Sequence, residues 1–308
     1  MDILLTLTFI FIGVLFLAIL VILLIGMICY KFTFKRYDDI KEPMDYINRV
    51  NDPEVIDWLN KVDREEIDIK AFDNIKLHGF YLKSLQNLHK TIIFVHGYRS
   101  IYCKAVAVAK YFYEKGYNIL FYCQRGHHYS EGTTTMGYKE EKDLKSWINY
   151  LVNLDNSMEI GLLGFSMGAH VAMLAVGDDI PANVKYAIED AGYSNLYQEF
   201  EEMLKKKSKF APTKFLLYCT KNISDLHGFP LNSDVTKSLR NSKVPTLFIH
   251  GTKDVVVDYK HFESCYKNFN SNIYKEAKTF PNSDHCCSFI NYSEEYLGTV
   301  ENFIKKVN

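Results

Sequence analysis

The sequence lacks three features that would each indicate a particular class of protein. Its 36 Lys and Arg residues are balanced by 37 Asp and Glu residues, so it has no basic excess of the kind that nucleic-acid-binding domains use. It contains no internal repeat and no low-complexity run. Its seven cysteines show no CxxC pair and none of the spacings typical of zinc ligands. We therefore expect no nucleic-acid partner, no metal and no cofactor.

The cysteines are odd in number, which favours free thiols in a reducing setting over a disulfide framework. Cys286 and Cys287 are adjacent, and a vicinal pair seldom forms a disulfide with itself. The alternative for this pair is redox sensitivity or adventitious metal binding. The other five are Cys29, Cys103, Cys123, Cys219 and Cys265.

One long segment near the N-terminus lacks charge altogether. Residues 3–30 contain no charged side chain and are almost wholly apolar, and a membrane-spanning helix needs about 20 such residues. A secretory signal would have a shorter apolar core, a basic start and a small-residue cleavage site. This chain begins Met1-Asp2 and has the bulky Ile28 before Cys29. We therefore predict an uncleaved transmembrane anchor over residues 3–30.

The five-residue run Gly164-Phe165-Ser166-Met167-Gly168 fits the nucleophile pattern Gly-x-Ser-x-Gly. An apolar strand precedes it and a good helical segment, residues 169–175, follows it. In this motif a sharp strand-to-helix turn lifts the serine hydroxyl clear of the sheet. Gly164 and Gly168 are needed because side chains there would collide with a neighbouring strand or helix. The motif predicts Ser166 as a nucleophile, and the alternative is a tight turn without chemistry.

A serine hydroxyl needs a base to take its proton and an acid to orient that base. In enzymes with this turn, the order along the chain is serine, acid and histidine. Asp254 follows the apolar strand 245–250, and His285 lies in a polar turn before the last helical segment, at about residues 293–306. Asp254 and His285 are therefore the predicted acid and base.

Two backbone N–H groups are predicted to stabilise the oxyanion. One belongs to Met167, directly after the nucleophile. The other belongs to Tyr98, in the loop that follows the apolar strand 91–95.

With these residues, the chain from about residue 65 to 308 resembles the α/β-hydrolase superfamily of serine hydrolases. Within that superfamily it is similar to the bacterial membrane-anchored Bem46 and YqkD-like group. The motifs that carry the resemblance are residues 96–98, 124–132, 164–168 and 189–193. The second resembles the family's Asp-x-Arg-Gly-His-Gly-x-Ser-x-Gly loop, but Cys123 stands where the Asp is usual and His128 replaces a Gly. That loop is structural in the family, so the resemblance implies a change at the pocket rim and little change in catalysis.

Other histidines and acids are alternatives to these assignments. Asp190 is the alternative acid, because some family members place the acid one strand earlier. Asp284 adjoins His285, and neighbours in sequence rarely form a hydrogen bond of the required geometry, so we interpret it as a solvated turn carboxylate. Among the histidines, we interpret His127 and His128 as loop packing or pocket rim, His96 and His250 as turn-stabilising, and His170 as an inward or sideways residue of the helix after Ser166.

Strand and helix segments alternate from residue 91 onward, which is typical of a mostly parallel sheet with helices on both faces. The resemblance implies that this is the α/β-hydrolase fold, and the catalytic groups are expected at the carboxyl ends of the strands, where such sheets bind ligands. Residues 66–70 and 77–83 alternate in the strand manner and predict an antiparallel hairpin at the sheet edge. The other predicted strands are 91–95, 118–122, 160–165 and 184–188, and the intervening helices are 105–115, 139–151 and 167–176.

The predicted organisation is an anchor at 3–30, a polar connector at 31–64 with helix potential around 53–62, and a hydrolase domain at 65–308. Residues 193–234 break the alternation and predict a small helical cap over the pocket. Phe200 and Leu204 lie on one side of its first helix, and Lys205, Lys206, Lys207 and Lys209 lie on the other. We interpret these lysines as a solvated face; the alternative is contact with anionic lipid headgroups.

These features predict a membrane-anchored serine hydrolase that cleaves a carboxylic ester or thioester of a small-molecule or lipid-like acyl substrate. One alternative is a non-catalytic scaffold that binds a ligand or partner at the membrane, because fold does not imply function. Another is a serine peptidase. The positive charges of Lys31, Lys35 and Arg36 after the span favour a cytoplasmic catalytic domain, as do the unpaired cysteines. Anchored surface hydrolases, however, commonly face outward.

Overall fold

The computed structural model describes residues 3–39, 41–86, 88–102 and 105–308. The chain divides into two compact units. The anchor unit combines the N-terminal residues up to Lys35 with Tyr197–Asn232, and the sheet unit combines Arg36–Leu196 with Ser233–Asn308.

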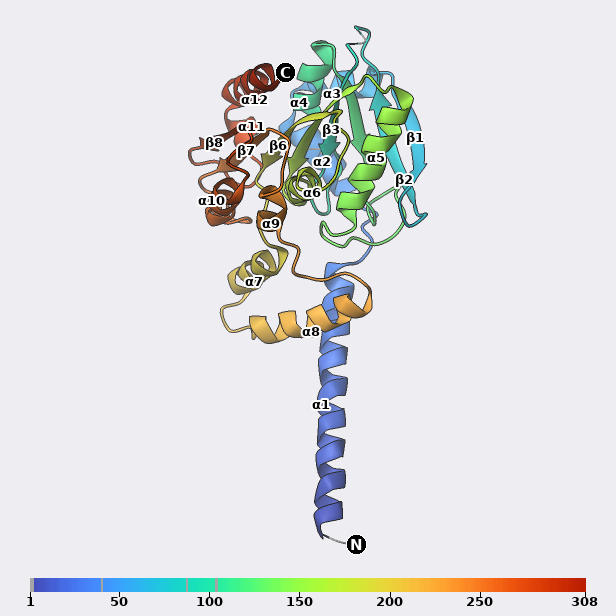
Figure 1. Ribbon diagram of the computed structural model, residues 1–308, viewed down its shortest axis with the longest axis vertical. Helices are drawn as coiled ribbons and strands as arrows, with labels where there is room; N and C mark the ends of the chain where they lie inside the picture. Colours follow the sequence, from blue (N-terminus) through green and yellow to red (C-terminus); the bar gives the residue numbers. More distant parts are fainter. Residues whose placement is uncertain (1–2, 40, 87, 103–104) are drawn as a thin grey trace. The chain divides into compact units, whose positions relative to one another are not determined.

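The sheet unit is built on an eight-stranded sheet with the order β1-β2-β4-β3-β5-β6-β7-β8 (Figure 1). The pairs β1–β2 and β2–β4 are antiparallel, and the other neighbours are parallel. The predicted edge hairpin and the mostly parallel sheet are therefore confirmed. The strands are β1 (Glu65–Lys70), β2 (Lys76–Leu82), β3 (Lys90–Val95), β4 (Asn118–Tyr122), β5 (Glu159–Phe165), β6 (Val184–Asp190), β7 (Thr246–Gly251) and β8 (Lys275–Phe280).

Helices cover both faces of this sheet, because alternate residues of its central strands are apolar on each side. On one face, Ile93 and Val95 of β3 pack with α5 (Glu140–Leu154), α6 (Met167–Val176) and α10 (Tyr259–Asn268). On the other face, Ile92 and Phe94 pack with α4 (Val106–Glu114) and α12 (Ser293–Val307). The unit also contains two short helices, α9 (Val235–Leu239) and α11 (Ser288–Asn291).

Residues 36–64 contain the helix predicted around residues 53–62, and a further helix precedes it. They contain α2 (Lys41–Val50) and α3 (Pro53–Lys61), and Asp52 caps α3 by accepting the backbone N–H of Glu54. Ile47 and Leu59 are buried in one apolar cluster with Val106 of α4. This part of the connector therefore packs on the sheet unit.

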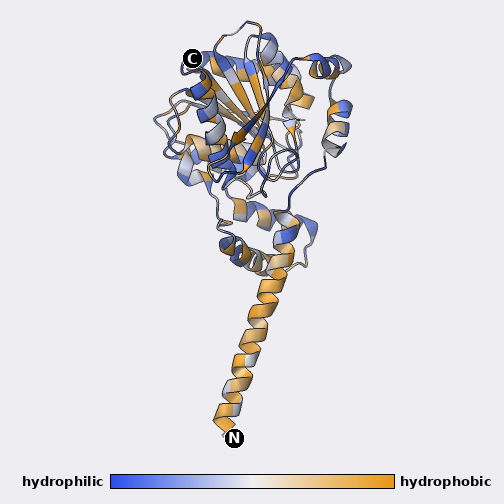
Figure 2. Cartoon of the chain, turned by 90° about the vertical axis from the view of Figure 1, so that its right-hand side faces the viewer, coloured by the Kyte–Doolittle hydropathy of each residue, from blue (hydrophilic) through white to orange (hydrophobic). Residues whose placement is uncertain are grey.

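The anchor unit contains α1 (Ile3–Thr33), α8 (Thr213–Leu226) and most of α7 (Leu196–Lys207). Among the described residues, α1 is the helix long and apolar enough to cross a membrane, and its hydrophobic character is visible along the helix in Figure 2. The predicted helical insertion is thus present, and it forms one unit with the N-terminal helix. That it covers the pocket stays a prediction.

Candidate active site

Ser166 lies at the sharp turn between β5 and α6, with the backbone angles φ 55° and ψ −118°. A non-glycine residue at positive φ is strained, and such strain concentrates at functional sites. A Cβ at Gly164 would lie 2.4 Å from the Gly168 carbonyl oxygen, and one at Gly168 would lie 1.9 Å from the Val95 carbonyl oxygen. The two predicted elbow glycines are therefore required by the close approach of α6 and β3 to this turn.

The structure brings the three predicted catalytic residues together. His285 Nε2 lies 2.8 Å from Ser166 Oγ, and His285 Nδ1 lies 2.8 Å from Asp254 Oδ2. Since a carboxylate only accepts, Nδ1 carries the proton and Nε2 is left free to accept the serine proton. This is the arrangement of a base aligned between a nucleophile and an orienting acid.

The Asp254 carboxylate is held by the turn that follows β7. Its Oδ1 accepts the backbone N–H groups of Val256 and Val257, both at 2.8 Å, and the side chain is fully buried. These bonds fix the carboxylate so that Oδ2 is directed at His285. His250, at the end of β7, lies 3.5 Å from the same Oδ2 and donates from Nε2 to the Val257 carbonyl at 3.1 Å, which agrees with a turn-stabilising role.

Burial disfavours a charge on the His285 imidazole, but the contacts with Cys286 and Asp254 outweigh it and raise the pKa of His285 above its ordinary value. The Asp254 carboxylate, whose Oδ2 lies 2.8 Å from Nδ1, favours the imidazolium. The same carboxylate would stabilise the imidazolium that forms when His285 takes a proton from serine.

The two alternative acids have other partners. Asp190, at the end of β6, accepts the Tyr296 hydroxyl at 3.0 Å. Asp284 accepts the backbone N–H of Val255 at 3.0 Å and that of His285 at 2.7 Å. Asp284 thus fixes the turn that carries His285, rather than acting only as a solvated carboxylate.

Ser166 opens into a small cavity of about 120 Å³ at the carboxyl end of β3 and β5. The loop after β3 approaches closely, since a Cβ at Gly97 would lie 3.3 Å from the Ser166 Cβ. Met167 is the first residue of α6, where backbone N–H groups lack intrahelical partners. The cavity lining includes Gly97, Tyr98, Phe165, Ser166, His285 and Cys286. Tyr98 and Met167 are therefore beside the nucleophile, and their role as oxyanion donors stays a prediction.

Histidines from a second loop, residues 123–132, hold the loop that carries Tyr98. His127 Nε2 accepts the backbone N–H of Arg99 at 3.1 Å, and His128 Nε2 donates to the Ser100 carbonyl at 3.1 Å. Burial lowers the pKa of His127 to about 4, so its ring is neutral at pH 7, with Nδ1 donating to the Arg125 carbonyl. The sequence interpretation of His127 and His128 is loop packing or pocket rim. Both rings pack in the loop region by bonding the neighbouring loop directly, and neither is among the residues that line the cavity.

His96 joins the same two loops. Its Nε2 accepts the backbone N–H of Gln124 at 2.9 Å, and its Nδ1 donates to the Gly97 carbonyl at 2.7 Å. Burial lowers the pKa of His96 well below its usual range. The neutral tautomer that both bonds need is therefore the stable one.

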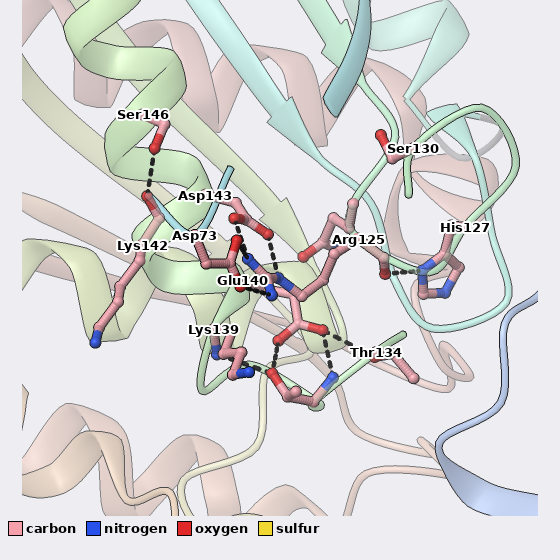
Figure 3. A network of polar contacts seen from close by, with 12 residues as sticks. Asp73, Arg125, His127, Ser130, Thr134, Lys139, Glu140, Lys142, Asp143 and Ser146 are labelled. Carbon is pink, nitrogen blue, oxygen red and sulfur yellow. Dashed lines mark hydrogen bonds and ion pairs between the residues drawn. The ribbon is translucent and has the colours of Figure 1, made fainter. Parts of the chain in front are cut away.

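A buried ionic network fixes the base of the 123–132 loop (Figure 3). Arg125 makes two 2.6 Å contacts with the carboxylate of Asp143 and a 2.9 Å contact with Asp73. Burial raises the pKa of Asp143 to about 6, although Arg125 opposes the rise. Glu140, on the same helix, accepts the hydroxyl of Thr134 at 2.9 Å. The sequence did not indicate this network, whose members are dispersed along the chain.

The departures of this loop from the family motif have local explanations. Cys123 is buried in the apolar cluster with Ile47 and Val106, and burial raises its pKa to about 12, so that it packs as a neutral thiol. His128, in place of a glycine, has a φ of 47°.

The cysteines that the structure describes form no disulfide with one another, and Cys103 lies outside the described residues. Cys286 is buried and lines the cavity beside Ser166. Cys287 is half-buried, and its thiol lies 3.4 Å from the carbonyl oxygen of His285.

Residues 86–216 match the protein family described as serine aminopeptidase, S33. The matched segment includes Tyr98 and Ser166 and ends before Asp254 and His285. The chain is 26% identical to the YqkD protein of Bacillus subtilis, covering 79% of this chain and 82% of YqkD. It is 25% identical to the YfhR protein of Salmonella typhi, covering 78% of this chain and 81% of YfhR.

Solved structures of esterases have the same fold. The esterase Pf2001 of Pyrococcus furiosus aligns with a TM-score of 0.64 and 25% identity, covering 80% of this chain and 92% of the esterase. Est1E of Butyrivibrio proteoclasticus, solved with ferulic acid, aligns with a TM-score of 0.59 and 21% identity, covering 78% of this chain and 98% of Est1E. The second likeness concerns the fold alone.

Proposed function

We propose that this chain, an α/β hydrolase similar to YqkD, is a membrane-anchored serine hydrolase that cleaves a carboxylic ester or thioester. The observation that carries the proposal is the continuous hydrogen-bond path from Asp254 through His285 to Ser166, with both contacts at 2.8 Å. The proposed chemistry uses these side chains and two backbone N–H groups, without a metal or cofactor.

In the first half of the reaction, Ser166 Oγ attacks the acyl carbonyl while His285 Nε2 takes its proton. The N–H groups of Tyr98 and Met167 stabilise the oxyanion of the tetrahedral intermediate. Removal of one such donor typically lowers turnover by about 10²–10³. His285 then delivers the proton to the departing alcohol or thiol, which leaves Ser166 acylated.

In the second half, His285 takes a proton from water, and the resulting hydroxide attacks the acyl-enzyme. The proton passes to Ser166 Oγ as the acid product leaves. Asp254 holds the imidazole in the tautomer that both halves need and stabilises its charged form.

Labelling with a fluorophosphonate probe tests this proposal. We expect the detergent-solubilised wild type to react covalently, because the probe requires an activated serine, and we expect Ser166→Ala to be unlabelled while its thermal unfolding stays cooperative. Folded wild-type protein that is not labelled would instead favour the non-catalytic scaffold. Retention of hydrolase activity in Ser166→Ala would overturn the mechanism.

A serine peptidase is the second candidate, because the matched family is described as a serine aminopeptidase. Thioester and oxygen ester leaving groups depart more readily than amines, so an ester screen and an aminoacyl-arylamide screen separate the two. Hydrolysis of the arylamides at rates equal to the esters would favour the peptidase.

The anchoring part of the proposal rests on α1, whose length and hydropathy suit a single membrane span. We expect the full chain to remain in the membrane fraction after alkaline carbonate extraction. Protease protection of the sheet unit in sealed vesicles or spheroplasts then distinguishes a cytoplasmic from an outward-facing domain, and the lysines after the span favour the cytoplasm.

A further inference from the structure

The helical insertion is attached to the end of α1 by close packing within the anchor unit. A Cβ at Gly26 of α1 would lie 2.3 Å from the Cys219 carbonyl oxygen of α8, so glycine is what allows the two backbones to approach. Tyr30 stacks on His227 with ring centroids 4.4 Å apart, and Phe34 lies edge-on to Phe229 at 5.0 Å. Two levels of α1 and the residue that follows the helix therefore hold α8 and the turn after it.

This attachment places α8 at a defined depth along α1. Gly26 lies 23 positions after Ile3, which at about 1.5 Å per residue is a rise of about 35 Å. The hydrocarbon core of a bilayer is about 30 Å thick. If α1 spans the bilayer, Gly26, where α8 packs on α1, therefore lies in the headgroup region of the bilayer. Figure 1 shows α8 running across α1 rather than along it, so that α8 would lie roughly parallel to the membrane surface.

One face of α8 and the segment before it expose large apolar side chains. Phe215, Tyr218 and Leu226 are 41%, 53% and 75% exposed. Their spacing of three and eight residues places them on one side of the helix, and the buried Leu217 and Ser224 lie on another. Phe210, in the turn before α8, is 98% exposed. Exposed aromatic and aliphatic side chains of this kind are typical of surfaces that enter the membrane interface.

The same stretch is strongly basic. Between residues 203 and 222 there are six lysines and no acidic residue, although the whole chain has a net charge of −1. Lys205 pairs with Glu201 and Lys221 with Asp225, which come from the flanking parts of α7 and α8. Lys207, Lys209 and Lys214 are exposed. Lysines near a bilayer attract anionic lipid headgroups while their alkyl chains lie along apolar surface.

We propose that residues 205–226 form an interfacial platform that binds the headgroup region of a bilayer containing anionic lipids. Phe210, Phe215, Tyr218 and Leu226 enter the boundary between headgroups and acyl chains, and the lysines contact the phosphates and carboxylates. This inference rests on the proposed anchoring by α1. It adds that the insertion is itself a lipid-binding element, whose position is fixed by α1.

Tryptophan quenching in the full-length protein tests the apolar part of the platform. Phe215→Trp is reconstituted in phosphatidylcholine and phosphatidylserine vesicles that contain brominated acyl chains, and its emission is compared with that of the wild type, whose tryptophans are Trp58 and Trp147. Tyr274→Trp, directly before β8 in the sheet unit, is the matched control at an exposed aromatic position. We expect additional quenching for Phe215→Trp and none for the control. Tyr218→Trp serves as a second probe if Phe215→Trp does not fold.

Charge neutralisation tests the basic part. In the Phe215→Trp background, Lys206→Gln, Lys207→Gln and Lys209→Gln together should reduce the quenching in phosphatidylserine-containing vesicles and leave it unchanged in pure phosphatidylcholine. The control triple, Lys83→Gln, Lys243→Gln and Lys267→Gln, removes three exposed charges of the sheet unit and should have no effect. Equal effects of the two triple variants on the quenching would overturn the proposed contact between the platform lysines and anionic headgroups.

The possible outcomes distinguish a failure of the platform proposal from a failure of the anchoring or catalytic proposals. Protein that resists carbonate extraction and labels with fluorophosphonate, but shows no more quenching at positions 215 and 218 than at 274, overturns the platform alone. Extraction by carbonate overturns the anchoring and the platform with it. Absence of fluorophosphonate labelling with quenching intact overturns only the catalytic proposal.

Discussion

The Nε2 atom of His127 accepts the backbone N–H of Arg99 at 3.1 Å, and so joins the 123–132 loop to the loop beside the nucleophile. Arg99 has a φ of 52°, in the left-handed region that a bulky residue seldom adopts. Tyr98, the predicted oxyanion donor, directly precedes it. The orientation of the Tyr98 N–H is therefore linked to a histidine that does not itself line the cavity.

His127→Ala tests this link. We expect turnover to fall by about tenfold to a hundredfold, which is less than the full loss of an oxyanion donor, with a much smaller change in KM. The physical reason is that the substitution removes the bond to the Arg99 N–H. The loop can then relax, which misaligns the Tyr98 N–H, a group predicted to act in the transition state. Steady-state kinetics on an ester substrate measure the changes in kcat and KM separately. His89→Ala, at an exposed histidine, is the control, and a rise in KM with unchanged kcat would argue against a positioning role.

The chain order of the site could be predicted, since Ser166, Asp254 and His285 each follow a recognisable apolar strand or precede a periodic helix. The limits of β4 and α6 agree with the prediction because each is largely apolar. Helix α10 is not among the predicted elements. Its apolar stripe is aromatic rather than aliphatic, since Tyr259, Phe262 and Tyr266 recur at helical spacing among polar residues and pack on the sheet.

Other features depend on contacts between distant parts of the chain. Cys219 of α8 packs on Gly26 of α1, 193 positions earlier, and neither residue carries a local signal for the other. The bonds of His127 depend on the orientation of its ring, which is set by burial and by the Arg125 carbonyl. Sequence patterns locate elements and motifs, but they do not specify which side chain satisfies which buried backbone group.

Asp254→Asn should change the pH dependence of activity as well as its rate. The base must be neutral to accept the serine proton, so activity is lost as the pH falls below the pKa of His285. Because the Asp254 carboxylate raises that pKa, its removal should shift the acid limb of kcat/KM toward lower pH. In the well-studied serine protease triad, the equivalent change lowers kcat by about 10⁴. A pH–rate profile of both proteins measures the shift, and an acid limb that stays in place or moves upward would contradict the assignment of Asp254.

Gly168→Ala should destabilise the fold rather than only slow the reaction. The new Cβ would lie 1.9 Å from the Val95 carbonyl oxygen, and neither the β3 backbone nor α6 can move without disturbing the sheet. Forced overpacking typically costs about 1–3 kcal/mol, and we expect the upper end or more here because both partners are backbone. Gly298→Ala, on α12, is the matched control, since nothing lies within 4 Å of its added Cβ. Equal melting temperatures for the two variants would refute the steric account of the elbow.

His170 should make the protein less stable in mild acid. Its ring is buried on α6, where Nδ1 donates to the Tyr193 carbonyl at 2.7 Å and Nε2 accepts the Ser233 hydroxyl at 2.8 Å. Burial lowers its pKa from 6.5 to about 4. Between these pH values the unfolded chain binds more protons than the folded one. The contribution of His170 to the free energy of unfolding is therefore fully present above pH 6.5 and is lost as the pH falls toward 4. A pKa difference of roughly 2.5 units corresponds to about 3 kcal/mol at pH 4.

The effect of this one histidine can be isolated by substitution. His170→Gln removes the titrating group, so the free energy of unfolding of the variant should decline less than that of the wild type between pH 6.5 and pH 4. Denaturant unfolding of both detergent-solubilised proteins at several pH values gives the difference. Parallel pH profiles for the wild type and His170→Gln would contradict this account, because they would mean that the folded state tolerates a charged ring at this position. The two hydrogen bonds of His170 require the neutral tautomer instead.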